Sequence, residues 1–95
     1  MKTYDVVIAG AGIIGLSIAW QLARRSSLRI AVVEKGSAVG EGSTGASSAI
    51  CRVRYSLDET LLLARDGINA YRHWGAYTGL RNPVAGFHQD GVLWM

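Results

Sequence analysis

The stretch that decides the fold is YDVVIAGAGIIGLSIAWQLARRSSLRIAVVEK, residues 4–35. Two short apolar runs, residues 4–9 and 28–33, are rich in the β-branched side chains typical of strands. Between them, residues 14–25 carry apolar side chains at helical spacing. This order predicts a right-handed βαβ unit with parallel strands, and the nearly continuous first run predicts a strand buried on both faces.

A glycine motif, Gly10-Ala11-Gly12-Ile13-Ile14-Gly15, joins the first run to the helical pattern. In a GxGxxG motif the first glycine allows a tight turn, the second lets a pyrophosphate approach the backbone, and the third lets the helix pack closely on the sheet. The helix N-terminus then offers free N–H groups and a positive dipole end to phosphates. Glu34 follows 19 residues after Gly15, at the end of the second run, where a carboxylate can accept hydrogen bonds from ribose hydroxyls.

These glycines could also serve a βα turn that binds nothing, and a GxGxxG motif alone is a weak signal. Here the strand, the helix, the second strand and the terminal acid all agree, which favours a dinucleotide site. The negative charge of Glu34 repels a 2′-phosphate and therefore disfavours an NADP-type ligand.

Residues 35–48 change composition to glycine, serine and threonine. Such a segment is either a flexible solvent loop or a segment that lines a ligand. We favour the second interpretation because the loop starts beside the expected ribose site, and binding residues concentrate on loops held by a rigid scaffold. Its candidate ligand-lining residues are Gly42, Ser43, Thr44, Ser47 and Ser48.

The rest of the chain predicts an added helix and the start of a β segment. Ser56-Leu57-Asp58-Glu59 has the form of a capping box, and a helix is expected from there to about residue 77, with Gly79 as its C-cap. Its apolar row is Leu61, Ala64, Ile68 and Tyr71. Residues 87–94 predict a strand, an Asp-Gly turn and a second strand. Arg52 and Arg54 would share one face of an extended segment, and spacing alone favours a solvated pair.

Composition limits the classes of function. The chain has 95 residues, 49% of them hydrophobic, with a formal net charge of +3. Its basic residues are scattered, which gives nucleic-acid binding little support. One cysteine, Cys51, cannot form an internal disulfide, and neither His73 nor His88 has neighbours that complete a metal site. The N-terminus lacks the features of a signal peptide or a membrane span, so a cytoplasmic location is expected.

The length indicates an incomplete domain. A dinucleotide-binding sheet usually has more than the two strands that are clear here, and a two-stranded parallel unit leaves apolar faces uncovered. We therefore interpret the chain as the N-terminal piece of a longer protein. The expected division is a βαβ unit with its cofactor loop in residues 1–55, a helix in residues 56–79 and the start of a β segment in residues 84–95.

The chain resembles the FAD-dependent D-amino-acid oxidase and sarcosine oxidase superfamily over essentially its whole length. The resemblance lies in residues 10–15 with Gly-Ile-Ile-Gly-Leu-Ser at 12–17, in Glu34-Lys35, and in the loop Gly-Ser-Thr-Gly-Ala-Ser-Ser-Ala at 42–49. The Ser47-Ser48-Ala49-Ile50 stretch, Arg52 and Tyr55-Ser56 most resemble the sarcosine oxidase β-subunit-like and dimethylglycine dehydrogenase-like members.

The resemblance implies FAD as cofactor and a Rossmann-like α/β FAD-binding unit followed by an antiparallel substrate-domain segment. It also implies oxidation of a C–N bond in an amino acid or N-methylated amino acid by hydride transfer to the flavin, with oxygen or an electron-transfer partner as the next acceptor. Gly10 to Gly15 would bind the pyrophosphate, chiefly through Ala11 to Ile14, while Glu34 and Lys35 would bind the adenosine ribose. Ser43, Thr44, Ser47 and Ser48 would run toward the flavin.

Arg52 matches the position of a substrate-carboxylate arginine in monomeric sarcosine oxidases. Those oxidases carry a second basic residue where this chain has Ala49, which leaves open whether the enzyme is an oxidase or a dehydrogenase. Two rival interpretations also stay open: an FAD-dependent 2-hydroxy-acid oxidoreductase of the same fold, and a truncated fragment that is inactive by itself.

Overall fold

A computed structural model describes residues 2–82 and 85–89 of the chain. The chain divides into two compact units, Met1–Ala49 and Ile50–Met95, and each is described by itself. Among the described residues, no helix is both long enough and apolar enough to cross a membrane.

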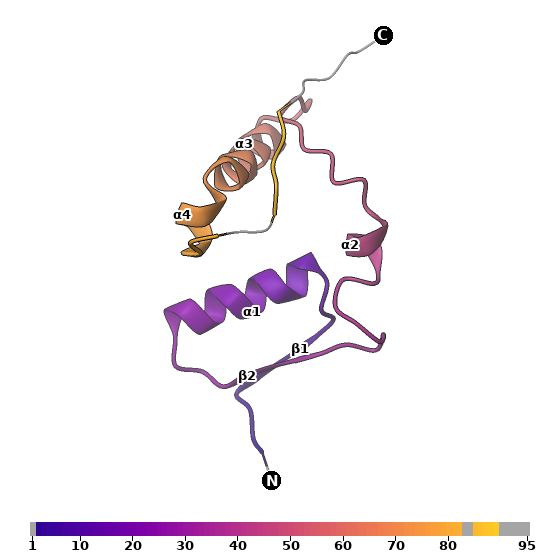
Figure 1. Cartoon of the computed structure of the whole chain (residues 1–95), viewed down its shortest axis with the longest axis vertical. Coiled ribbons are helices and arrows are strands. Elements are labelled where there is room, and N and C mark those ends of the chain that lie inside the picture. The colour runs from indigo at the N-terminus through magenta and orange to yellow at the C-terminus, as the bar shows by residue number, and fades with distance from the viewer. Residues whose placement is uncertain (1, 83–84, 90–95) are drawn as a thin grey trace. The chain divides into compact units, whose positions relative to one another are not determined.

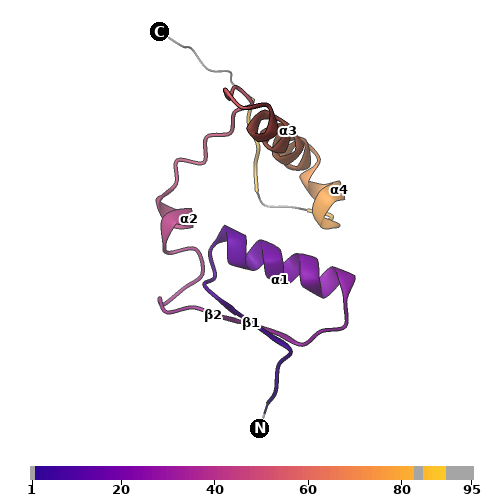
Figure 2. The ribbon, with the colours of Figure 1, turned by 180° about the vertical axis from the view of Figure 1, so that it is seen from behind.

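The first unit is the predicted βαβ arrangement (Figure 1). Strand β1 (Val6–Ala9) is followed by helix α1 (Ile13–Arg25), strand β2 (Ile30–Val33) and a single helical turn, α2 (Ser43–Ala46). The two strands pair in parallel, with Val6 opposite Ile30 and Ala9 opposite Val33. Seen from behind, the same unit shows α1 lying along the two strands (Figure 2). The prediction of an α/β fold with parallel strands and a crossover helix is confirmed.

Both strands begin later than the sequence pattern predicts. The Arg29 carbonyl accepts the N–H groups of Asp5 and Val6, at 2.8 and 3.2 Å, and the Arg29 N–H donates to the Asp5 carboxylate at 2.7 Å. These bonds tie the start of one strand to the start of the other, and the regular ladder runs only from Val6 and Ile30 onward.

The expectation that β1 is buried on both faces is wrong. Its residues alternate between half-buried and exposed, and Val7 is 61% exposed. Because successive side chains of a strand point to opposite faces, a helix packed on one face covers every second residue. Helix α1 covers one face at Gly15, where an added Cβ would lie 3.4 Å from the Ile8 side chain, whereas Ile14 of the same helix is 73% exposed.

The second unit consists of helix α3 (Asp58–Arg72), helix α4 (Trp74–Thr78) and the segment at residues 85–89. Ile68 is buried, and Leu61 and Ala64 are half-buried, so the predicted apolar row of α3 is confirmed at these three positions. Tyr71 extends the row into a cluster of aromatic rings, with its centroid 5.6 Å from that of Trp74 and 6.0 Å from that of Phe87.

The predicted capping box at Ser56 is wrong. Helix α3 begins at Asp58, its cap residue is Leu57, and no side chain caps it. Ser56 therefore lies one residue too early to reach the N–H groups of the first turn. Asp58 and Glu59 supply the favourable charge in that turn instead, because carboxylates stabilise the positive end of the helix dipole.

The predicted single helix is interrupted at His73, whose φ of −117° and ψ of 44° depart from helical values. The His73 N–H still donates to the Asn69 carbonyl, and the His73 carbonyl accepts the Tyr77 N–H at 2.8 Å. The helical hydrogen bonds therefore continue across His73, while its non-helical backbone separates α3 from α4. Gly79, with φ of 78°, ends α4 in the left-handed conformation, which confirms it as a C-cap.

The predicted β segment lies only partly within the described residues. Residues 85–89 are described and form no strand, while residues 90–95, with the Asp-Gly turn, lie outside the described part. The antiparallel segment and the three-part division of the chain remain predictions.

Candidate functional site

The glycine turn lies at the carboxyl ends of the two parallel strands. Gly10 has a φ of +109°, which a residue with a side chain rarely adopts, and its N–H donates to the Val33 carbonyl at 2.7 Å. A Cβ added to Gly15 would collide with the Gly10 carbonyl oxygen and lie 3.4 Å from the Ile8 side chain. The two glycines thus allow the helix to start close against the strand that precedes it. Ala11, between them, is 2% exposed.

Glu34 is bound to this turn. Its Oε2 accepts the Ala11 N–H at 2.8 Å, and its Oε1 accepts the Gly36 N–H at 3.0 Å. These two backbone bonds, that of Gly36 first, lower the pKa of the Glu34 carboxyl below its ordinary value. The side chain is therefore ionised at neutral pH. Each carboxylate oxygen has a second lone pair, so both oxygens can still accept a hydroxyl hydrogen.

A hollow of about 480 Å³ lies at the same edge of the sheet. It is lined by residues from the ends of both strands and from the positions just after them: Ala9, Gly10, Val33, Glu34 and Lys35. The structure thus brings Gly10 together with Glu34 and Lys35, from which it lies far apart in sequence. The crevice outside the carboxyl ends of parallel strands is where α/β sheets bind their ligands.

Thr44 also contacts the glycine turn. Its Oγ1 accepts the Ile13 N–H at 2.9 Å, and a Cβ added to Gly12 would lie 2.9 Å from the same oxygen. Gly12 is the N-cap residue of α1 and has no side chain with which to cap it. A residue 31 positions away in the sequence therefore caps the first turn of α1. Neither this contact nor the Glu34–Ala11 bond is marked by local spacing, so sequence reasoning missed both.

The other predicted loop residues make local contacts. Gly42 is the N-cap residue of α2 and Ser43 is its first residue. The Ser47 hydroxyl accepts the Ala49 N–H at 3.0 Å, which supports Ala49 at a φ of +54°, and Ser48 is exposed.

Arg52 belongs to the second unit. Its guanidinium lies 4.8 Å from the centre of the Tyr55 ring, within the range of a cation–π contact. Together with Arg54, Tyr55 and Ser56 it lines a hollow of about 390 Å³. All four side chains can donate hydrogen bonds and none is acidic, a composition suited to an anion.

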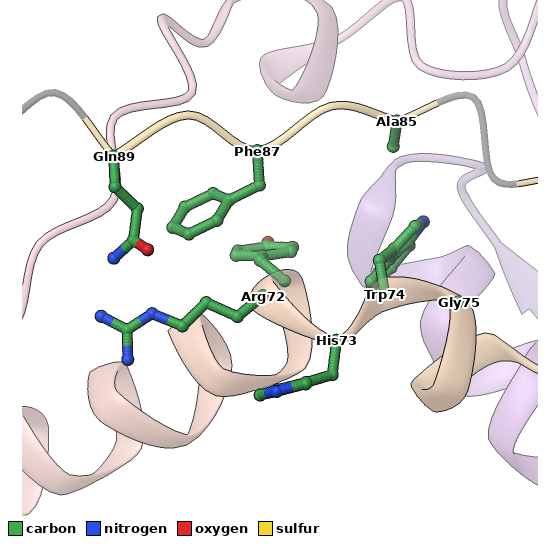
Figure 3. Close-up of a pocket in the computed structure, with 8 residues that line it drawn as sticks. Arg72, His73, Trp74, Gly75, Ala85, Phe87 and Gln89 are labelled. Carbon is green, nitrogen blue, oxygen red and sulfur yellow. The ribbon is translucent and has the colours of Figure 1, made fainter.

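A further hollow of about 470 Å³ lies between the end of α3 and the segment at residues 85–89 (Figure 3). With the Gln89 amide turned so that its oxygen faces Arg72, that oxygen accepts from Nε and Nη2 at 3.0 and 2.7 Å. The His73 ring points away from the hollow in Figure 3, and its Nδ1 lies 3.1 Å from the Asn69 carbonyl oxygen. In residues 2–82 and 85–89, no three His, Cys, Asp or Glu side chains are grouped so as to bind a metal ion.

The glycine turn fits a bound dinucleotide. Gly10 and Gly15 allow the tight turn, and Gly12, with the Thr44 hydroxyl beside it, stands at the start of a helix of 13 residues, where phosphates bind favourably. The ionised Glu34 lies at the end of β2, beside the cationic Lys35. These features suit an adenosine ribose that carries no 2′-phosphate.

Residues 5–95 match the DAO family of FAD-dependent oxidoreductases. The chain is 67% identical over 33 residues to hydrogen cyanide synthase subunit HcnC of Pseudomonas aeruginosa, an alignment that covers 35% of the chain and 8% of that protein. It is 34% identical to sarcosine oxidase subunit beta of Rhodobacter capsulatus over 74% of the chain and 17% of the relative. It is 32% identical to glycine oxidase of Bacillus licheniformis over 97% of the chain and 26% of the relative.

The chain thus spans about a quarter or less of the length of these relatives. No solved structure matches it.

Proposed function

The chain belongs to the FAD-dependent oxidoreductase (DAO) family, and from this premise we propose that it forms the ADP-binding part of an enzyme that oxidises a C–N bond. The substrate is an amino acid or an N-methylated amino acid. The resemblance to a sarcosine oxidase subunit and to a glycine oxidase supports this class, since both of those proteins are named for amines that carry a carboxylate.

The observation that carries the proposal is the bond between the Glu34 carboxylate and the Ala11 N–H, at 2.8 Å. It joins the ionised carboxylate that is the candidate ribose ligand to the glycine turn at the start of α1, the candidate phosphate site. The family is FAD-dependent, and FAD when bound supplies the acceptor for a hydride.

The residues of the turn act by binding and orienting. The backbone N–H groups of Gly12, Ile13 and Ile14 would hold the pyrophosphate at the positive end of α1, while the Ala11 N–H, which donates to Glu34, would fix the shape of the turn. Thr44 either shares the Ile13 N–H with a phosphate oxygen or donates its own hydroxyl to that oxygen, since a hydroxyl both donates and accepts. Glu34 accepts from the ribose hydroxyls with its free lone pairs, and Lys35 balances charge at the same edge.

The remaining predicted residues bind the flavin part of the cofactor and the substrate. Gly42, Ser43, Ser47 and Ser48 supply small side chains and hydroxyl donors along the cofactor. Arg52 binds the substrate carboxylate, for which a guanidinium is well suited. The partners are the small-molecule substrate and, for reoxidation, oxygen or an electron-transfer protein.

Purification of the protein and a visible spectrum test the cofactor first. Flavin absorbance that survives desalting supports the proposal, and its absence after reconstitution with FAD contradicts it. A panel of sarcosine, dimethylglycine, glycine and D-amino acids, set against 2-hydroxy acids, then tests the bond that is oxidised. Turnover of 2-hydroxy acids alone would replace C–N oxidation with C–O oxidation.

A further inference from the structure

Residues 36–46 leave the end of β2 and return to the glycine turn (Figure 1). On the return, the Gly40 N–H donates to the Ala11 carbonyl at 2.9 Å, and Thr44 Oγ1 accepts the Ile13 N–H at 2.9 Å. Both contacts bind the backbone of the glycine turn, the proposed binding site for the dinucleotide. The shape of the turn therefore depends on what holds this returning segment in place.

Glu41 binds Ser37 within this returning segment, residues 36–46. Its Oε1 accepts the Ser37 hydroxyl at 2.7 Å, and its Oε2 accepts the Ser37 N–H at 3.1 Å. One carboxylate thus binds both polar groups of one residue, and hydrogen bonds to an ionised acceptor are the stronger kind. The bond pair fixes residues 37–41 immediately before Gly42 and α2.

Gly36 leaves room for this contact. A Cβ added at Gly36 would lie 2.7 Å from Glu41 Oε2 and 3.7 Å from Glu34 Oε1. The carboxylates of Glu34 and Glu41 therefore both border the space beside one glycine. Any side chain at position 36 would push the end of the flexible Glu41 side chain away from Ser37.

We propose that Glu41 is a positioning residue for the dinucleotide. It acts through Ser37 and the returning segment, which set Gly40 against Ala11 and Thr44 against Ile13, and it does not itself contact the ligand. This inference rests on the proposed function, because it concerns the same site. Without the Glu41–Ser37 contact, ordering the segment becomes a cost of binding.

Two variants that break the contact in different ways test this role. Glu41→Ala removes the carboxylate, whereas Gly36→Ala keeps it and displaces it. Each variant is expected to raise the Kd for FAD, and for ADP alone, by about three- to tenfold, the effect of losing one or two hydrogen bonds. The variant with both substitutions should bind FAD and ADP no less tightly than the single variant with the lower affinity, because both substitutions remove the same contact. Asp66→Asn, an exposed acid of α3, is the charge-matched control.

Binding is measured with the apoprotein by quenching of flavin fluorescence and by calorimetry with ADP, and thermal unfolding is followed in parallel. Equal losses for FAD and ADP, partial recovery in Glu41→Gln and an unchanged control support the proposal. Wild-type affinity in both Glu41→Ala and Gly36→Ala overturns it while the proposed function stands. Failure of the wild-type protein to bind either ligand overturns both.

Discussion

The two units of the chain hold their backbone in different ways. In the first unit, side chains bind backbone groups far away in the sequence, as Glu34 does at Ala11 and Thr44 at Ile13. In the second unit, the Thr78 hydroxyl donates to the Trp74 carbonyl and the Arg72 guanidinium donates to the Asn69 side chain, both within about one helical turn. Longer contacts there come from aromatic rings and from the Arg72–Gln89 pair.

In the first unit, segments of backbone lie so close together that side chains would not fit between them. In the second unit, the helices are held by the packing of their side chains. In the first unit a single added carbon would collide with a carbonyl oxygen. In the second unit, Gly67 of α3 has open space where its Cβ would be. The same substitution should therefore have opposite effects in the two units, and this contrast gives the largest expected effect.

Gly15→Ala should be the most damaging change. The new Cβ collides with the Gly10 carbonyl, a backbone atom that cannot turn aside, so α1 must shift from β1. Overpacking of this kind costs about 1–3 kcal/mol of unfolding free energy, and we expect FAD to be lost on desalting. Gly67→Ala, in contrast, should stabilise the protein by up to about 1 kcal/mol, because alanine favours a helix. Chemical denaturation measures both, and equal effects would remove the contrast.

Arg52→Ala tests whether the second unit takes part in the reaction. Loss of a guanidinium that binds a carboxylate should raise KM for amino-acid substrates by about tenfold, with a smaller change in kcat. Arg54→Ala, from the same hollow, is the matched control and should leave KM near the wild-type value. Steady-state kinetics on the FAD-loaded protein decide the matter, and an unchanged KM in Arg52→Ala removes it from the site.

Thr44→Val keeps the shape of the side chain and removes the oxygen that caps α1. The free energy of unfolding of the apoprotein should fall by about 1 kcal/mol, the usual effect of losing a helix cap. Ser56→Ala should change it by less than about 0.5 kcal/mol, because no side chain caps α3. A large fall in the free energy of unfolding of Ser56→Ala would mean that α3, like α1, is capped by a side chain.

The smallest effect concerns pH. The folded-state pKa of Glu34 lies below its ordinary value of 4.5, so its contribution to stability is complete above that value. The contribution is lost as the pH falls below 4.5 toward the lowered folded pKa. Thermal unfolding of the wild type and Glu34→Gln is followed from pH 7 to pH 3. The difference between their melting temperatures should become smaller only below about pH 4.5. A difference in melting temperature that does not change with pH would contradict the role of the ionised carboxylate.

The sequence predicted β1, α1 and β2 of the first unit because local chemistry determines them, whereas the single helical turn α2 lies in a stretch that was predicted as a loop. A GxGxxG motif between a strand and a helix leaves few alternatives, and Gly10 and Gly15 have the roles that the motif assigns. The burial of β1 could not be predicted, since it depends on what covers each face of the sheet. The start of α3 was also missed, because two acids after Leu57 stabilise the first turn as well as a serine cap would.

Within the candidate site, residue types were easier to predict than contacts. Glu34 was predicted to bind the ribose from its place after β2, but its bond to Ala11 depends on how two distant segments meet. The prediction that Thr44 lies along the flavin stays a prediction, and its contact with the Ile13 N–H at the first turn of α1 was not predicted. Contacts across 23 and 31 residues leave no periodic signal in a single sequence.

The return of Thr44 to Ile13 also constrains chain length. Surface loops usually tolerate inserted residues, because a longer loop adds little entropy cost. The segment between Glu34 and Thr44 is bound to the turn at both ends and, through Gly40, in its middle. One extra residue at positions 37–39 would put Gly40 and Thr44 out of register with Ala11 and Ile13. The number of residues in this loop is therefore as much a part of the site as the glycines themselves.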